Sequence, residues 1–397
     1  MLSALELKKI LKVRPNPKSI WYGEPNFGSY YTEQEIDSLY KLIKNSNNWD
    51  VGFGPNPKEV SDFENNFSQY CGVSNSIAVS NNGDGFEMVL NAINLSSKDE
   101  VITPSLNFKA WLMIMHKFRF QLKFCDIDIE SLNISIEDLE KKISRKTRLI
   151  CPVHMGGISC KSKEIDEIAK YYSKKYGKKI YVIYDSARAT GVHYKDSPVG
   201  KYGDCEIFSF HGAKLMTALG EGGMITTNNK ILANKLRAMR SYGDEKCWGM
   251  NYRMTKIGAF MGNLQLKRID NMNSERILIA NKRIQYLYGC DDFLLPNITK
   301  KLENVFYLFP IILGKNYTKK ERDKLIKILE VKFKIICSVP KHINRRWSFI
   351  KNNYGIPKLI NTDYVYNRIF CPIMHPQITE KQNKYISAAI LESIKHI

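Results

Sequence analysis

Short apolar runs alternate with longer amphipathic segments through the middle of the chain, and this alternation constrains the fold more than any other feature. The apolar runs carry strand signals, and the segments between them carry helix signals. The expected strands are residues 76–80, 100–103, 121–125, 147–153 and 179–184, and the expected helices between them are residues 84–95, 107–117, 136–143 and 162–176. Strands joined through helices form right-handed crossover units, so the pattern predicts a mostly parallel sheet covered on both faces.

A second, smaller unit is expected to follow, because 397 residues exceed one small domain. We expect strands at 207–210 and 223–227, one long helical region at 255–288, and then strands at 305–313 and 333–339 with helices at 319–329 and 379–394. The fold class is therefore α/β, with a large, mostly parallel-sheet domain and a smaller C-terminal α/β domain. The expected division is an N-terminal segment (1–59) that packs on the small domain or a dimer interface, the large domain (60–255), and a long connecting helix with the small domain (256–397).

The chain is unusually basic, with 60 Lys and Arg residues against 40 Asp and Glu residues and a net charge of +20. Such a charge favours anionic partners, namely nucleic acid, a membrane surface or phosphorylated small molecules. The charges are spread along the chain without a helix-turn-helix, basic helix or aromatic–basic sheet pattern, so we expect no nucleic-acid partner. The longest nearly apolar stretch, residues 305–313, is too short for a membrane span, which takes about 20 residues.

The nine cysteines include no Cys-x-x-Cys pair, and the seven histidines include no His-x-x-x-His pair. Because the number of cysteines is odd and their spacing shows no pairing pattern, we expect free thiols in a reducing cytoplasm and not a disulfide framework. The spacings also lack the pattern of metal ligands, so we expect a cytoplasmic protein without a metal site.

Three polar segments follow predicted strands, at the edge where open α/β sheets bind ligands. The first, Ser80-Asn81-Asn82-Gly83-Asp84-Gly85, joins a strand to a helix start. Unpaired N–H groups there favour an anion such as phosphate, although the same residues also form ordinary turns and helix caps. The second is Asp185, which directly follows a buried strand. Its carboxylate needs a cationic partner to stay ionised, either a protonated heterocyclic nitrogen or a structural Arg or Lys.

The third segment runs from Ser209 to Lys214 and precedes a glycine-rich stretch at 220–223. It places a hydroxyl and an amine in a loop framed by glycines. A lysine there can act as an amine nucleophile when desolvation or a neighbouring cation removes its proton, whereas a lone loop lysine is more often solvated. The three segments together, in this order on this fold, favour a catalytic site.

These segments resemble the sugar aminotransferases of the DegT/DnrJ/StrS type, which are pyridoxal-phosphate enzymes of fold type I. The resemblance covers most of the chain. Besides the second and third segments above, it includes Gly54-Pro55, Tyr70-x-Gly72, residues 104–108, 126–128, 152–154 and 251–254, and the ending from Cys371-Pro372 to Thr379-Glu380. So many pieces in the family's order indicate a fold type I pyridoxal-phosphate transferase that works as a homodimer.

Carried over residue by residue, the resemblance implies that Lys214 and Asp185 are catalytic. Lys214 would bind the cofactor covalently and later move a proton between the two carbons of the substrate imine. Asp185 would keep the ring nitrogen of the cofactor protonated, and Phe108 would lie against the ring. Relatives that dehydrate sugars carry histidine in place of this lysine, so Lys214 implies amino transfer.

The resemblance also implies that Asn82, Gly83 and Ser209 hold the cofactor's phosphate, together with Asn251 from the neighbouring subunit, so that the active site is shared within a dimer. Two positions depart from the family. Asn82-Gly83 stands where the family usually has Gly-Thr, and Arg188 stands where it commonly has a glutamine that hydrogen-bonds the cofactor's phenolic oxygen. The guanidinium of Arg188 could stabilise that oxygen, point to a phosphate or carboxylate of the substrate, or pair with a surface acid.

The predicted function is therefore a pyridoxal-phosphate-dependent aminotransferase of amino-sugar and surface-polysaccharide synthesis. By the resemblance, the donor is an amino acid, glutamate, and the acceptor a nucleotide-linked keto sugar. Two alternatives stay open: a smaller phosphorylated ketone as the acceptor, and a non-catalytic binding or regulatory relative of the same fold. The sequence does not say which keto sugar is used. The basic stretch from Lys341 to Trp347 and residues 21–25 could contact the substrate or form ordinary surface loops.

Overall fold

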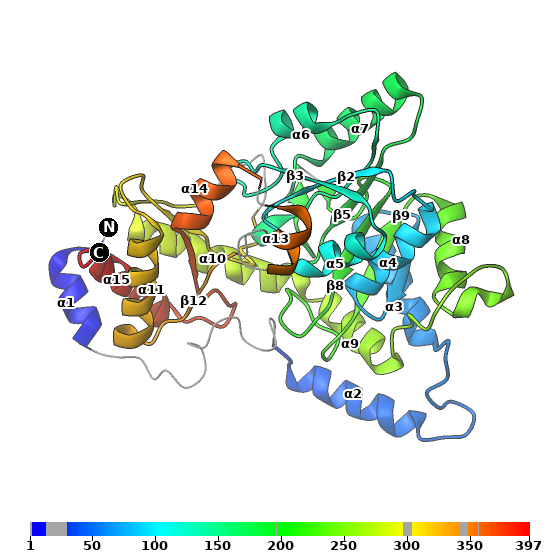
Figure 1. The fold of residues 1–397 in the computed structure, drawn as a ribbon. Coiled ribbons are helices and arrows are strands. Elements are labelled where there is room, and N and C mark those ends of the chain that lie inside the picture. The colour runs from blue at the N-terminus through cyan, green and yellow to red at the C-terminus, as the bar shows by residue number, and fades with distance from the viewer. Residues whose placement is uncertain (1, 13–29, 196, 297–303, 341–347, 356) are drawn as a thin grey trace.

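The computed structural model describes residues 2–12, 30–195, 197–296, 304–340, 348–355 and 357–397. Within them the chain forms a seven-stranded sheet, a four-stranded sheet and a two-stranded hairpin, β6 (His193–Tyr194) with β7 (Ser197–Pro198). Figure 1 shows the large sheet and its helices on one side of the molecule, and the first and last helices of the chain together on the other. The helix α10 (Ile269–Leu287) runs between the two sides.

The large sheet comes from the part of the chain in which strand and helix signals alternate. Its strands are β1 (Asn75–Val79), β2 (Glu100–Pro104), β3 (Gln121–Cys125), β4 (Thr147–Ile150), β5 (Tyr181–Asp185), β8 (Cys205–Ser209) and β9 (Gly223–Thr227), in the order β1-β9-β8-β5-β4-β2-β3. All described pairings from β8 to β3 are parallel, and β9 is antiparallel to both its neighbours. The predicted mostly parallel sheet is confirmed.

Helices cover both faces of this sheet, because apolar residues point to both sides of its strands. On β1, Ile77 and Val79 pack in one hydrophobic cluster, whereas Ala78 packs in another on the opposite face. The first cluster contains α4 (Asn82–Ile93), α5 (Lys109–Lys117) and α8 (Lys230–Met239), and the second contains α3 (Lys58–Cys71) and α9 (Lys256–Leu266). A third cluster, built around Leu139 and Ile165, joins α6 (Ile136–Lys142) and α7 (Ser162–Tyr176) to the sheet.

The small sheet is antiparallel and has the order β10-β11-β13-β12. Its strands are β10 (Phe293–Leu294), β11 (Ile311–Leu313), β12 (Cys337–Ser338) and β13 (Ile369–Pro372). One hydrophobic cluster joins it to α1 (Ala4–Lys12), α10, α11 (Lys319–Phe333) and α15 (Glu380–Ile394), and α14 (Ile360–Arg368) lies beside it. Two helices lie elsewhere: α2 (Glu33–Ser46) packs on α9, and α13 (Ser348–Tyr354) reaches α5, where His116 Nδ1 and the Tyr354 hydroxyl are 2.8 Å apart.

Several predicted elements were wrong in extent. The strand predicted at 147–153, for example, ends at Ile150. The single helical region at 255–288 is two helices, α9 and α10, separated at Lys267 and Arg268, where the Arg268 guanidinium pairs with Glu35 of α2 at 2.6 Å. The strand predicted at 305–313 begins only at Ile311, because the backbone before it is hydrogen-bonded to Gly156 and Gly157.

The strand predicted at 333–339 is also shorter, since α11 extends to Phe333 and ends at Lys334 in the left-handed conformation (φ 59°). The strand that follows is only Cys337–Ser338. All nine cysteines are free thiols. In the described part of the chain, no helix has both the length and the apolar character needed to cross a membrane.

Candidate active site

The ends of β1, β5 and β8 meet at the side chain of Asn82, the first residue of α4. Its Nδ2 donates to the Ile207 carbonyl at 2.8 Å and lies 3.4 Å from Asp185 Oδ1, and its Oδ1 accepts from Trp111 Nε1 at 2.7 Å. Trp111 is buried and stacks on Phe86 of α4 with ring centroids 3.7 Å apart. The amide of Asn82 is therefore engaged within the protein, and an anion at this turn meets backbone N–H groups instead.

A cavity of about 790 Å³ opens at these strand ends. It is lined by Asn82 and Gly83 at the start of α4 and by Ser209 at the end of β8. Of the remaining predicted site residues, Phe108, Asp185, Arg188 and Lys214 also line it. The structure thus brings together seven of the eight residues that the sequence singled out.

Asp185 is the buried acid of this cavity, with only 3% of its surface exposed. Burial raises its pKa, while the Arg188 guanidinium, the Ala187 N–H and the Lys214 amine oppose that rise. Both hydrogen bonds that its carboxylate accepts within the described residues end on Oδ1, from Ala187 N at 3.0 Å and from Asn82 Nδ2 at 3.4 Å. A buried carboxylate with a raised pKa is a favourable partner for a cation placed in the cavity.

Two cations, Arg188 and Lys214, lie near one aromatic ring in the cavity wall. The Arg188 guanidinium carbon is 5.7 Å from the centroid of the Tyr307 ring, and Lys214 Nζ is 5.4 Å from the same centroid. Arg188 Nη1 lies 3.8 Å from Met155 Sδ, and its buried Nε has no hydrogen-bond partner among the described residues. Arg188 therefore faces the cavity and does not pair with a surface acid in the described part of the chain.

The loop that carries Lys214 is fixed by backbone hydrogen bonds. The N–H of Phe210 donates to the Gly222 carbonyl at 2.8 Å, and that of Gly212 donates to the Gly220 carbonyl at 2.8 Å. The N–H of Ala218 returns to the Phe210 carbonyl at 2.9 Å. The glycine-rich stretch thus closes the loop against its own strand end, which holds the amine near Asp185.

The start of α4, which also lines the cavity, is suited to bind an anion. The side chain of Asn81 caps α4 by accepting from Asp84 N at 2.9 Å, so the helix begins where Asn82 and Gly83 line the cavity. The N-terminus of a helix carries a partial positive charge and free N–H groups. A Cβ on Gly223 of β9 would lie 2.7 Å from the Asn81 carbonyl carbon, so only glycine lets this strand approach the turn so closely.

Asn251 is the predicted site residue that the structure leaves outside the cavity. It is exposed, and its Oδ1 accepts from Arg253 Nε at 3.0 Å. Its predicted reach into a neighbouring subunit stays a prediction. The stretch from Lys341 to Trp347 and residues 21–25 lie outside the described residues.

Sequence reasoning missed Tyr307, which belongs to the segment leading into β11. Val305 N and Leu308 N donate to the Gly157 and Gly156 carbonyls at 3.0 Å each, which places Tyr307 against the cavity. No local pattern indicated this, because the contact joins segments that are far apart in the sequence. Asn107 and Met155 also line the cavity. Asn107 lies within residues 104–108 and Met155 directly follows residues 152–154, and the resemblance had included both segments.

The residues present fit the cofactor that the sequence suggested. The buried Asp185 carboxylate suits a protonated ring nitrogen, the start of α4 with the Ser209 hydroxyl suits a phosphate, and Lys214 supplies an amine in the same cavity. Phe108, which is 40% exposed at the cavity, offers an aromatic face for a ring.

Comparison with known proteins points to one family. The sequence profile described as the DegT/DnrJ/EryC1/StrS aminotransferase family matches residues 31–391. The chain is 34% identical over 279 residues to GDP-perosamine synthase of Caulobacter vibrioides, a match that covers 68% of this chain and 73% of that protein. It is 31% identical over 341 residues to dTDP-3-amino-3,6-dideoxy-alpha-D-galactopyranose transaminase of Aneurinibacillus thermoaerophilus, covering 82% and 90% of the two chains.

Solved structures show the same fold. Helicobacter pylori PseC, an aminotransferase involved in the biosynthesis of pseudoaminic acid, superposes with a TM-score of 0.86 over 96% of this chain and 100% of that chain, at 20% identity. The aminotransferase from Psychrobacter cryohalolentis superposes with a TM-score of 0.82 over 95% and 99% of the two chains, at 24% identity. The predicted fold class, fold type I, is confirmed.

Proposed function

The chain belongs to the DegT/DnrJ/EryC1/StrS aminotransferase family, and on that premise we propose that it moves an amino group from L-glutamate to a keto sugar linked to a nucleoside diphosphate. It is a pyridoxal-phosphate enzyme. When bound, this cofactor supplies an aldehyde that takes up the amino group and a ring that takes up electrons from the substrate carbon. The observation that carries the proposal is the convergence of Lys214, Asp185 and the start of α4 on one cavity.

Lys214 and Asp185 carry the proton chemistry in this proposal. Lys214 Nζ would take a proton from the substrate carbon that bears the nitrogen and deliver it to the cofactor's aldehyde carbon on the other side of that nitrogen, and the fixed loop would keep the amine in reach of both. The Asp185 carboxylate holds a proton on the ring nitrogen, because a buried anion stabilises the cation opposite it. The raised pKa of Asp185 shows that keeping its carboxylate ionised in the buried site is costly, and the cation on the ring nitrogen lowers this cost.

The phosphate lies at the start of α4 in this proposal. The backbone N–H groups of Asn82 and Gly83 and the Ser209 hydroxyl donate to it, since the Asn82 side chain is already bonded to Ile207 and Trp111. The Arg188 guanidinium, with its unpartnered Nε facing the cavity, donates to the phenolic oxygen of the ring. Phe108 lies against the ring.

The proposed acceptor is a nucleotide-linked keto sugar, and the product an amino sugar for a surface polysaccharide. Two relatives support this class of substrate by name, since one is a GDP-perosamine synthase and the other a dTDP-amino-sugar transaminase. The net charge of +20 also favours a substrate that carries two phosphates, because a positive field raises the encounter rate with an anion.

The enzyme is proposed to work as a homodimer in which Asn251 reaches the partner's phosphate site. Exposed apolar residues surround Asn251 in the sequence: Tyr242, Trp248 and Met250 are 60%, 53% and 49% exposed. On the loop after α2, Trp49 is fully exposed as well. Such residues favour burial against another chain.

The test is a half-reaction assay with purified protein and pyridoxal phosphate. Adding L-glutamate should abolish the visible absorbance of the bound cofactor and release one equivalent of 2-oxoglutarate, and a nucleotide-linked keto sugar should then restore the absorbance. Lys214→Ala should do neither, whereas Lys201→Ala, an exposed lysine outside the cavity, should behave as the wild type. Restoration only by a smaller phosphorylated ketone would refute the nucleotide-sugar proposal, and the absence of any response would refute amino transfer.

A further inference from the structure

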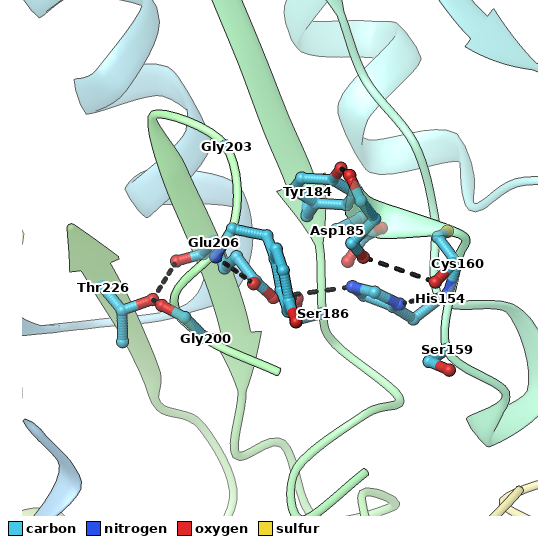
Figure 2. Close-up of polar contacts among 12 residues, drawn as sticks. His154, Ser159, Cys160, Tyr184, Asp185, Ser186, Gly200, Gly203, Glu206 and Thr226 are labelled. Carbon is cyan, nitrogen blue, oxygen red and sulfur yellow. Dashed lines mark hydrogen bonds and ion pairs between the residues drawn. The ribbon is translucent and has the colours of Figure 1, made fainter. Parts of the chain in front are cut away.

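Glu206 is a fully buried carboxylate in the middle of β8 that the chemistry above does not use. Its Oε2 accepts from the Ser186 hydroxyl at 2.6 Å, and its Oε1 accepts from Tyr202 N at 3.0 Å. His154 Nε2, also fully buried, is 3.5 Å from Oε2. Figure 2 shows Glu206, Ser186 and His154 facing one another below the end of β5, where Asp185 lies. A buried charge in the centre of a sheet is costly, so its retention calls for a reason.

The imidazole of His154 has a defined orientation and proton. Cys160 N donates to its Nδ1 at 2.9 Å, and the Tyr184 ring stacks on it with centroids 5.3 Å apart. Burial lowers the pKa of His154, whereas Cys160 and, to a smaller extent, Glu206 raise it, and the net change is upward. If the ring carried a second proton, that proton would sit on Nδ1 and point at the N–H of Cys160, which donates to the same atom. The raised pKa favours the imidazolium, but the bond from Cys160 N requires an unprotonated Nδ1, and this geometry sets the protonation state. It leaves the imidazole neutral, with its one proton on Nε2 toward Glu206.

The backbone of His154 and of Ser186 holds the end of β5 from two sides, while the His154 and Glu206 side chains face each other at 3.5 Å without a hydrogen bond. The backbone N–H of His154 donates to the Asp185 carbonyl at 3.1 Å, and Asp185 N donates to the Pro152 carbonyl at 2.9 Å. On the other side, Ser186 N donates to the Ile207 carbonyl at 3.0 Å while its hydroxyl reaches Glu206. In the pairing of β5 with β8, Glu206 stands opposite Tyr184, one residue from the pair formed by Asp185 and Ile207.

We propose that Glu206 is a positioning residue for the proposed reaction: acting through His154 and Ser186, it fixes the end of β5 and places a negative charge behind Asp185. The inference rests on the proposed role of Asp185 as the partner of the ring nitrogen. Because His154 is neutral, His154 and Glu206 together carry one negative charge, on the Glu206 carboxylate. A second buried anion makes the Asp185 carboxylate a stronger base, so the ring nitrogen keeps its proton to higher pH.

Other ionisable groups also surround the two carboxylates. Those whose charges act on Glu206 or Asp185 are His154, Asp166 of α7, Tyr184 of β5, Tyr202, Cys71 of α3, Cys205 of β8, Cys151, Arg188 and Lys214. Asp166 is the most useful among them as a control. It is a largely buried carboxylate that bonds Tyr184 and Gly203 N but neither His154 nor Ser186.

The experiment titrates the ring nitrogen directly, by ¹⁵N NMR of the holoenzyme loaded with pyridoxal phosphate labelled at that atom. In Glu206→Gln the pH at which the ring nitrogen loses its proton should fall by about one unit relative to the wild type. Glu206→Asp, which keeps the charge, should recover at least half of that shift. Asp166→Asn should titrate within about 0.3 units of the wild type, although it removes a buried acid as well.

A second variant keeps the test decisive if Glu206→Gln does not fold. Replacing both partners of a buried polar pair by apolar residues is often neutral for stability, whereas removing one is costly. The double variant His154→Phe with Glu206→Leu removes the carboxylate and its imidazole neighbour together, although the Ser186 hydroxyl and the N–H groups of Tyr202 and Cys160 lose these acceptors. In the cofactor-loaded protein it should show the same downward shift. An unshifted titration in either folded variant, or an equal shift in Asp166→Asn, would show that Glu206 has only a structural role. If the wild-type ring nitrogen carries no proton at neutral pH, it is the proposed role of Asp185 that fails instead.

Discussion

Asp185→Asn separates the charge of this residue from its shape. Asparagine has the same outline, and its carbonyl oxygen can keep the two bonds that Asp185 Oδ1 accepts, from Ala187 N and from Asn82 Nδ2. What it loses is the negative charge that the proposal places opposite the ring nitrogen. The variant should therefore fold and bind cofactor, yet fail to keep that nitrogen protonated.

The magnitude follows from the burial of the site. Asp185 is 3% exposed, and removing one member of a buried charge pair costs about 3–5 kcal/mol. If that cost falls on the transition state, kcat drops by roughly 10²- to 10³-fold or slightly more, since about 1.4 kcal/mol corresponds to a factor of ten. The Michaelis constant for the sugar should change little, because the carboxylate does not contact the sugar.

The same substitution has the opposite effect on the cofactor-free protein. Burial raises the pKa of Asp185, so the native state binds its proton more tightly than the unfolded chain, whose value lies near 3.8. By linkage, the free energy of unfolding falls as pH rises from that value through the raised native pKa. Asp185→Asn lacks this fall and should be the more stable protein at neutral pH without cofactor.

Two assays check these expectations. Steady-state kinetics with glutamate and the sugar give kcat, and urea unfolding of the cofactor-free proteins between pH 4 and 8 gives the pH dependence of stability. A variant that keeps more than a tenth of wild-type kcat would refute the role of the charge. Identical pH dependence of unfolding in the two proteins would refute the account of burial.

Three further changes test other parts of the site. Arg188→Gln should shift the pH at which the bound cofactor's absorbance titrates, because Arg188 is the main group that lowers the pKa of Asp185; a change in the Michaelis constant for the sugar alone would assign Arg188 to the substrate instead. Asn251→Ala should weaken cofactor binding several-fold, measured by equilibrium dialysis, while sedimentation shows an intact dimer; unchanged affinity would contradict the shared site. Gly157→Ala should lower the free energy of unfolding by about 1–3 kcal/mol more than Gly177→Ala. Both glycines have positive φ, but a Cβ at Gly157 would lie 2.8 Å from Tyr307 N, whereas nothing lies within 4 Å of a Cβ at Gly177. If urea unfolding shows equal losses of free energy of unfolding in the two variants, the Tyr307 segment is not held against Gly157.

The parallel sheet could be predicted because its information is local. Each strand and helix carries its own periodicity, and crossover connections leave few topologies. The positions of Asp185 and Lys214 followed from the same logic, since residues after parallel strands meet at one edge of the sheet. The resemblance then supplied roles that spacing alone could not.

What could not be predicted depends on contacts between distant segments. The break between α9 and α10 coincides with the pairing of Arg268 with Glu35. Tyr307 reaches the cavity because its backbone is bonded to Gly156 and Gly157. The turn at Asn82-Gly83 was expected at the phosphate, but the bonds of the Asn82 amide to Trp111 and Ile207 were not foreseen. No periodicity or local motif encodes these pairings.

The central claim is that one amine, Lys214 Nζ, forms the covalent link to pyridoxal phosphate while Asp185 faces the ring. The direct measurement is borohydride reduction of the cofactor-loaded protein, followed by protease digestion and mass mapping of the peptides. The account predicts one pyridoxyl-phosphate adduct, on Lys214, at close to one per chain. An adduct on another lysine, or no adduct at saturating cofactor, would contradict it.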